Sequence, residues 1–518
     1  LSQQDLSNLP VVRKDLADTW IHGVASYPKE VAMVREARRR LRTVEMWLAL
    51  EGQTLSLAAR DKASRCIRTA YDGLALFAEH TWGLDVKSFL GAIPDYQRDA
   101  FAKYRLTEKC ATMEASWQEQ AERARSALAA CEEAEAAVGV TRASQTPTRP
   151  AAPCLNGVVE GGRYRLELNP ATGIIDSLYD KQNECLLLQN RDGHGAIHYR
   201  YDRYGTQEMT EYVRAYGYRF SDWGVLDNAR RGYPECEHLT RLPTFVECLR
   251  DGSTVLLRYQ TVGEQQHTGD AAQVELLIDV PADMGEVNIS VRLIAKPATP
   301  YVESGELVME LASENPRYFI NKPGCVLNPE TDIANGANHV YYALENFAAA
   351  QVGNALAVVA SRDCPLLSIG ENGVYGYRQH YQKNAADLRF CLFNNMWGTN
   401  FPQWIEGDLS FGFKVFAQDS GRTADAYEEA CEALDGAPIP ALPFTLPAGV
   451  RVTRLIPDGD ALLFHLHSMS DVPIVGELVF PGKRLRREDL LGRPITDWAC
   501  ERVPLAMNAY AVACYRAE

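Results

Sequence analysis

Residues 141–153 read Thr-Arg-Ala-Ser-Gln-Thr-Pro-Thr-Arg-Pro-Ala-Ala-Pro, and they divide the chain into two unlike parts. Three prolines in thirteen residues exclude a helix at this point and favour an extended linker. Apolar residues recur at helical spacing before this stretch, and they alternate with polar residues after it. The change of period predicts a helical part followed by a β part, in a multidomain α+β fold.

The part before the linker, residues 26–140, contains three long stretches with helical periodicity. The first starts near Pro28, a residue that suits the first turn of a helix. The second starts near Ser56 and ends after Phe77, and the third carries an apolar stripe from Met113 to Cys131. Three long helices joined by short turns predict an antiparallel three-helix bundle, with the apolar stripes in its core.

The part after the linker has the pattern of antiparallel strands. Residues 164–168 alternate, residues 169–173 form a turn and residues 174–179 return, which is typical of a hairpin. Further strands are expected at residues 253–259, 273–280, 286–295, 355–360 and 409–416. We therefore expect a large antiparallel β-sandwich over residues 154–420, a helical connection over 421–445 and a small β-sandwich over 446–518.

Composition excludes several classes of protein. The formal net charge of −15 argues against nucleic-acid binding, which needs a basic surface to neutralise phosphates. No apolar run approaches the roughly 20 residues of a membrane helix. The 13 cysteines are scattered without CxxC spacing, so we expect free thiols and a cytoplasmic location.

Three short motifs carry candidate chemistry. A histidine at a helix end can offer a neutral imidazole to a metal, tryptophan faces can stack on a sugar ring, and asparagine amides can bind hydroxyls. Each motif also has a structural interpretation: a helix-terminal histidine, a core tryptophan, or an asparagine that stabilises a turn. The motifs are Asp18-Thr19-Trp20-Ile21-His22-Gly23, Glu79-His80-Thr81-Trp82-Gly83 and Asn394-Asn395-Met396-Trp397-Gly398-Thr399-Asn400-Phe401.

In their order and spacing, these motifs resemble those of family-38 glycoside hydrolases, the retaining α-mannosidases. The segment from Asp15 to Pro28 is similar to the one that closes the catalytic barrel in that family, and residues 173–181 continue the resemblance. The resemblance implies a galactose-mutarotase-like supersandwich for the large β domain. It also implies that a bound zinc ion grips the sugar hydroxyls while an aspartate attacks the anomeric carbon.

The resemblance assigns site residues in this chain. His80 falls where the family places the last zinc ligand, and Trp20 falls where a tryptophan stacks on the sugar. The expected substrate-binding residues are Trp20, Asp18, Trp82, Asn394, Asn395 and Trp397. The sequence departs from the family pattern at Lys14, where the family has glycine, and at Thr81, where it has aspartate.

One motif of the family is absent from this sequence. No His-x-Asp pair occurs in the 518 residues, although the family carries one in its barrel, together with the nucleophile. We therefore expect residues 1–25 to be the tail of an N-terminal barrel domain outside this sequence, and we expect no catalytic nucleophile here. The chain alone is then expected to be inactive, with carbohydrate and the barrel as its partners.

Other interpretations remain open. The chain could be a carbohydrate-binding or scaffolding protein in which the histidine and tryptophans are structural, and a polysaccharide lyase is a further alternative. The pairs His465/His467 and His194/His198 are interpreted as ordinary strand or loop histidines rather than metal ligands, because no third ligand is identifiable. The tyrosine-rich residues 199–223 suit either sugar contact or a sheet interface.

Overall fold

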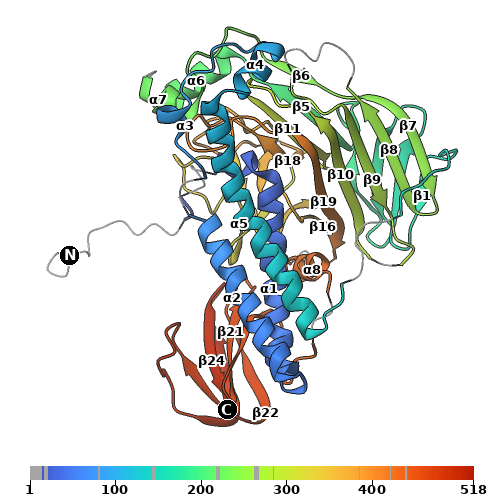
Figure 1. Cartoon of the computed structure of the whole chain (residues 1–518). Coiled ribbons are helices and arrows are strands. Elements are labelled where there is room, and N and C mark those ends of the chain that lie inside the picture. Colours follow the sequence, from blue (N-terminus) through green and yellow to red (C-terminus); the bar gives the residue numbers. More distant parts are fainter. Residues whose placement is uncertain are drawn as a thin grey trace, which may run out of the picture.

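The computed structural model describes residues 14–16, 21–79, 82–142, 148–217, 222–261, 268–283, 285–383, 385–419, 422–437 and 440–518. Helices and antiparallel β-sheets make up this part of the chain (Figure 1). The helices lie mainly before residue 140 and the strands after it, as the change of period at the linker predicts.

Three long helices lie side by side on one flank of the molecule (Figure 1): α1 (Pro28–Glu51), α2 (Leu57–Phe77) and α5 (Glu108–Val138). Their ends follow local rules. Pro28 stands in the first turn of α1, the Ser56 hydroxyl accepts a hydrogen bond from the Ala59 amide at the start of α2, and Gly139 ends α5 with φ of 80°.

The helical part contains more helices than the three that the sequence predicts. Between α2 and α5 lie α3 (Val86–Phe89) and α4 (Arg98–Arg105), and η1 (His22–Ser26) and η2 (Gly52–Thr54) are 3₁₀ turns. Helices of four and eight residues span too few turns to show a clear apolar period, so periodicity misses them.

The β part forms four antiparallel sheets. The four-stranded sheet runs β1 (Val158–Glu160), β2 (Tyr164–Asn169), β3 (Ile174–Asp180), β4 (Cys185–Gln189). The nine-stranded sheet runs β13 (Cys325–Leu327), β12 (Tyr318–Lys322), β15 (Phe347–Val352), β16 (Ala355–Ser361), β19 (Gly407–Gln418), β10 (Val287–Lys296), β9 (Gln273–Asp279), β8 (Thr254–Gln260), β7 (Thr244–Asp251).

Two further sheets complete the β part. The six-stranded sheet runs β14 (Tyr341–Ala343), β17 (Leu366–Ile369), β18 (Asp387–Asn394), β11 (Glu303–Glu310), β5 (Ile197–Arg203), β6 (Leu239–Arg241). The five-stranded sheet runs β20 (Val450–Asp458), β21 (Ala461–Ser468), β24 (Val512–Ala517), β22 (Ile474–Glu488), β23 (Ala499–Met507).

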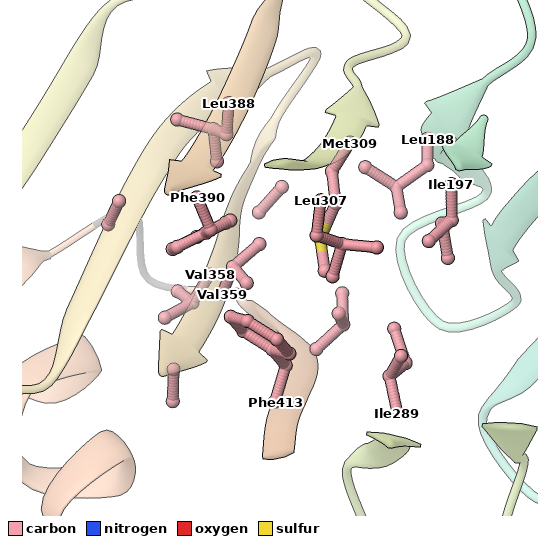
Figure 2. Close-up of a cluster of buried hydrophobic side chains, with 14 of the residues drawn as sticks. Leu188, Ile197, Ile289, Leu307, Met309, Val358, Val359, Leu388, Phe390 and Phe413 are labelled. Atoms are coloured by element: carbon pink, nitrogen blue, oxygen red, sulfur yellow. The ribbon is translucent and has the colours of Figure 1, made fainter. Parts of the chain in front are cut away.

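The largest core lies between the nine-stranded and six-stranded sheets (Figure 2). Ile289 of β10 and Phe413 of β19 are register partners in one sheet, and Leu307 of β11 and Phe390 of β18 are partners in the other. All four side chains are buried. Side chains alternate between the two faces of a strand, so the neighbours of these residues face away from this core.

Three helices interrupt or follow the large β region. α6 (Thr206–Gly217) and α7 (Asp222–Asn228) lie inside the range where only strands are expected, and α8 (Thr423–Asp435) follows β19. The five-stranded sheet packs on α1 through Met46, which joins the buried cluster around Phe444 and Phe464. α1 therefore contacts both β regions of the molecule.

Candidate functional site

Two of the three sequence motifs meet where η1 packs on the end of β18. The Asn394 amide donates to the backbone carbonyl of His22 at 3.0 Å, and the Ser26 hydroxyl donates to the backbone carbonyl of Asn394 at 2.8 Å. These partners are 372 and 368 positions apart in sequence. We refer to the contact region of residues 21–27, 82–83 and 394–403 as the motif junction.

The third motif enters the junction through Trp82. The Tyr27 hydroxyl donates to the Trp82 carbonyl at 2.6 Å, and the indole ring lies 4.7 Å from the Tyr27 ring. On its other side it lies 5.3 Å from the Phe401 ring. Trp82 is half-buried. Its ring contacts both Tyr27 and Phe401, and it therefore connects the helical part to the loop after β18.

Glycine is required where η1 meets this loop. A Cβ atom on Gly23 would lie 2.3 Å from the Phe401 ring, closer than any real contact. Gly83 has φ of 125° and would place a Cβ atom 2.7 Å from Trp117. The glycine at the end of both aromatic motifs therefore has a steric reason, which is close packing.

Asn394 and Asn395 use their amides inside the protein. The Asn395 oxygen accepts from the Glu303 amide at 2.8 Å, and its NH₂ group donates to the carbonyls of Tyr301 and Gln403. Both asparagines are completely buried. In this conformation their polar groups hold the loop in place and do not face solvent.

Trp397 is also buried. It is 1% exposed, and its ring packs 5.4 Å from His22 and 5.7 Å from Phe401. Of the expected substrate-binding residues that the structure describes, only Trp82 retains a partly exposed surface. Asp18, Trp20 and His80 lie outside the described residues, next in sequence to residues of the junction.

His22 was not among the candidate residues expected from the sequence, although it lies in the same motif as Trp20. Its ring is buried among Tyr341, Tyr212 and Trp397, and neither ring nitrogen has a hydrogen-bond partner among the described residues. Burial lowers the pKa of His22 to about 4, so the ring is neutral at physiological pH. The motif itself was the only signal for this residue.

Arg230 also holds the loop after β18, through the backbone carbonyls of Asn395 and Gln403. Its Nη2 donates to the carbonyls of Asn395 at 2.7 Å and Gln403 at 2.8 Å. Burial lowers the pKa of this guanidinium. A small cavity of about 20 Å³ beside Arg230 and Gln403 is large enough for one water molecule. No periodicity or motif marks Arg230, because its role depends on contacts more than 160 positions away.

A second polar cluster lies on the face of the six-stranded sheet away from the core. Asp202 accepts hydrogen bonds from Arg200, Thr240, Asn372 and His238, the last at 2.8 Å. Glu306 is buried beside it, and neither carboxylate oxygen has a hydrogen-bond partner among the described residues. Burial raises the pKa of Glu306 to about 7. No sequence motif marks this cluster, because its members come from separate strands and loops.

Several other histidines and tyrosines of the described residues use their polar groups within the protein. Nε2 of His467 lies 2.8 Å from the Gly324 carbonyl, and Nδ1 of His198 lies 2.8 Å from the Gly195 carbonyl. The Tyr201 hydroxyl donates a hydrogen bond to the buried Glu303 carboxylate, and the Tyr204 hydroxyl forms a hydrogen bond with the Ser304 hydroxyl. Part of the tyrosine-rich segment is helix α6 rather than strand, with Tyr212 buried.

The described residues do not form a complete metal site. No group of three or more His, Cys, Asp or Glu side chains in this part of the chain could hold a metal ion. A catalytic zinc site uses three protein ligands and a water molecule, so the described residues alone do not complete one. All 13 cysteines lie in the described part and are free thiols. In the same part, no helix is long and apolar enough to cross a membrane.

Comparison with known proteins gives one family model and a set of similar structures. Residues 24–261, less than half of the chain, match a family described as a domain of unknown function, DUF5054. No curated protein matches.

Solved structures of family-38 glycoside hydrolases are among those similar to the chain. An α-mannosidase from Enterococcus faecalis V583 is 9% identical with a TM-score of 0.46, and 72% of this chain covers 43% of it. A family-38 glycosyl hydrolase from Enterococcus faecalis is 9% identical with a TM-score of 0.45, and 73% of this chain covers 45% of it.

The β part has similar structures of its own. A putative aldose 1-epimerase from Escherichia coli K12 is 12% identical with a TM-score of 0.30, and 50% of this chain covers 98% of it. A galactose mutarotase-like protein from Lactobacillus casei is 12% identical with a TM-score of 0.29, with 50% and 99% covered. The chain spans less than half the length of the two enterococcal proteins.

Proposed function

We propose that this chain forms the helical and β-sandwich part of a zinc-dependent retaining glycoside hydrolase that acts on α-mannosides or related glycosides. One observation supports the proposal most directly: the three motifs that carry the family resemblance converge on one junction. Asn394 binds the backbone of η1, and Phe401 packs on Trp82. Segments separated by about 60 and 310 positions in sequence thus converge at one place.

The proposal gives the residues of this chain distinct roles. His80 supplies one zinc ligand, while Trp20 and Asp18 contact the sugar. The buried amides of Asn394 and Asn395 position the junction through hydrogen bonds to the backbone of His22 and Glu303. Bound zinc would supply Lewis-acid polarisation of the sugar hydroxyls. The nucleophile and the remaining zinc ligands come from residues outside this sequence.

The test is a set of variants in the full natural protein that contains this chain. We expect His80→Ala to reduce zinc content and α-mannosidase rate, by about 10–100-fold or more, the loss known for groups that hydrogen-bond to a metal ligand. Trp20→Ala is expected to keep its zinc and bind sugar more weakly. His194→Ala is the matched control, because His194 is an exposed histidine far from the junction in sequence.

Two outcomes contradict the proposal at different levels. If His80→Ala melts normally, retains zinc and hydrolyses α-mannosides at the parental rate, then His80 is not a zinc ligand. If the unmodified protein cleaves no α-glycoside with zinc supplied, the hydrolase assignment itself is wrong.

A second candidate function is a non-catalytic carbohydrate-binding or scaffolding protein. The observation that favours it is the burial of Asn394, Asn395 and Trp397, together with the use of both asparagine amides in hydrogen bonds within the protein. This candidate predicts no hydrolysis, whereas sugar binding survives His80→Ala. Measuring binding and turnover on the same variant therefore separates the two functions.

A further inference from the structure

A cleft separates the helical part from the nine-stranded sheet, away from the motif junction. It has a volume of about 370 Å³, and its walls come from seven separate places in the sequence. α1 contributes Glu36 and Arg40, and strands β10 and β19 form the floor. Arg142 and the end of α8 close one end, and Arg362 follows β16. Figure 1 shows α1 and α5 beside these strands, and α1 contacts β19. A volume in this range is typical of small-molecule sites.

The strand alternation places polar side chains on the floor of the cleft, beside Leu277 of β9. Ile289 and Phe413 point into the sandwich core (Figure 2). Their neighbours therefore face the helices: Asn288 pairs with Lys414 in the register, and Ser290 pairs with Gly412. The Lys414 ammonium lies 3.6 Å from Glu286, which is an ion-pair contact but not a hydrogen bond. Lys414 and the Ser290 hydroxyl thus offer donors to the cleft.

Cations outnumber carboxylates in the lining of the cleft. Glu36 accepts hydrogen bonds from Arg39, Arg40 and Arg362, so three guanidinium groups surround one carboxylate. Burial alone would raise the pKa of Glu36, yet the arginines outweigh it and lower this pKa to about 2. The charged lining residues are Arg40, Arg142, Arg362 and Lys414 against Glu36 and Asp363. Arg40 and Arg142 also form ion pairs with Glu135 of α5, which does not line the cleft.

Arg35 adds a further cation behind the same wall. Its guanidinium donates to the backbone carbonyls of Leu344, Glu345, Ser361 and Arg362. Carbonyls satisfy its hydrogen bonds but carry no full charge to cancel its own. The second carboxylate of the lining, Asp363, accepts a hydrogen bond from the Gly412 amide at 2.7 Å. The lining itself thus carries four cations and two carboxylates, in a chain whose net charge is −15.

We propose that this cleft binds a small hydroxylated anion, such as a sugar that carries a phosphate or carboxylate group. Lys414 and Arg362 pair with the anionic group at the floor and the end of the cleft, and Ser290 and Asn288 bind hydroxyls. The site is separate from the motif junction, and its existence does not depend on the hydrolase assignment. Charge-assisted hydrogen bonds to the anion supply most of the affinity.

Calorimetric titration of the full chain with four probes tests the proposal: glucose 6-phosphate, glucuronate, glucose and inorganic phosphate. We expect at least one of the two charged sugars to bind more tightly than glucose and phosphate, and added salt to weaken that binding. Whichever of these two sugars binds more tightly shows whether the cleft prefers a phosphate or a carboxylate group. Equal binding of glucose, or no binding by any probe, overturns the proposal.

Variants locate the binding in this cleft. Lys414→Gln is expected to weaken the charged sugar about tenfold, because one charge-assisted hydrogen bond is lost. Lys383→Gln is the matched control, since Lys383 is 74% exposed and pairs with Glu330 elsewhere on the surface. Ser290→Leu fills the floor and should abolish binding, with a thermal melt as the folding check. Unchanged affinity in both cleft variants places any binding elsewhere and overturns the proposal.

Discussion

At the scale of single residues, Asn395 shows why the same side chain supports two interpretations in sequence and only one in structure. Its amide makes three hydrogen bonds to the backbone, at Glu303, Tyr301 and Gln403. A sugar-binding amide needs at least one group free to meet a hydroxyl. Here every group that could do so is already used within the protein.

We expect Asn395→Ala to destabilise the fold rather than change sugar binding alone. Three buried hydrogen bonds are lost, although the Gln403 carbonyl keeps its bond from Arg230, so the free energy of unfolding should fall by about 3 kcal/mol. Denaturant unfolding measures this change, and Asn508→Ala, at an exposed asparagine, is the control. Normal unfolding together with lost sugar affinity would instead favour a direct binding role.

Glu306 gives a pH-dependent prediction at the same scale. Burial raises its pKa to about 7, from an ordinary value of 4.5. Arg389 lies 3.6 Å away, Arg200 and Cys391 are its register partners, and the charge of Asp202 raises the pKa further. A raised carboxyl pKa means that ionisation in the folded state costs free energy. The loss of stability begins above the unfolded pKa and reaches its full size above the folded pKa.

We therefore expect Glu306→Gln to gain stability relative to the unmodified protein as pH rises from 5 to 8. The gain is at most about 3 kcal/mol, because a tenfold difference in proton affinity between the folded and unfolded states is worth about 1.4 kcal/mol. Denaturant unfolding at several pH values measures it, and Glu314→Gln, at an exposed carboxyl, is the control. A gain that shrinks with rising pH would contradict the assigned pKa.

At the scale of elements, local signals predict the long helices and several of the strands. Strands β8, β9, β10, β16 and β19 begin and end within two residues of the expected positions. The short helices α3 and α4 and the helices α6 and α7 were missed. These helices span from one to little more than three turns, and short helices depend on packing against neighbours, which local periodicity does not reveal.

The cap of α2 gives a prediction at this scale. The Ser56 hydroxyl accepts from the Ala59 amide at 3.2 Å, so Ser56→Ala should lower the free energy of unfolding by about 1 kcal/mol. Ser64→Ala is the control, because Ser64 is an exposed serine inside the same helix, where alanine is the better helix former. Equal effects of the two changes would show that the cap contributes nothing.

At the scale of the whole molecule, the linker at residues 141–153 connects the helical part to the β part. Arg142 is held by Glu135 and by the Asp435 carbonyl, and it lies at the end of the cleft. Arg149 pairs with Glu275 of β9. Both ends of the linker are thus fastened to the structure by arginine contacts.

We expect a broad-specificity protease to cut first between these two arginines. Pro147 and several small polar residues in this part of the sequence disfavour helix and sheet, so the composition predicts a linker that a protease cleaves readily. Mass spectrometry of early fragments identifies the cut, and the helices α1 and α5 serve as the internal control. Early cuts inside those helices or in β10 would contradict the boundary at the linker.

The sequence by itself determined the division into a helical and a β part, the long helices, several strands and the motifs that resemble family-38 glycoside hydrolases. Residue spacing, helix caps and turns determine these features, and each of them acts over only a few residues. Only the tertiary structure decided that η1, Trp82 and the loop after β18 meet, and that the Asn394 and Asn395 amides are buried. It alone shows the cleft beneath α1 and the buried Glu306. Burial and hydrogen-bond partners depend on residues that lie up to 372 positions apart, and no local pattern encodes such contacts.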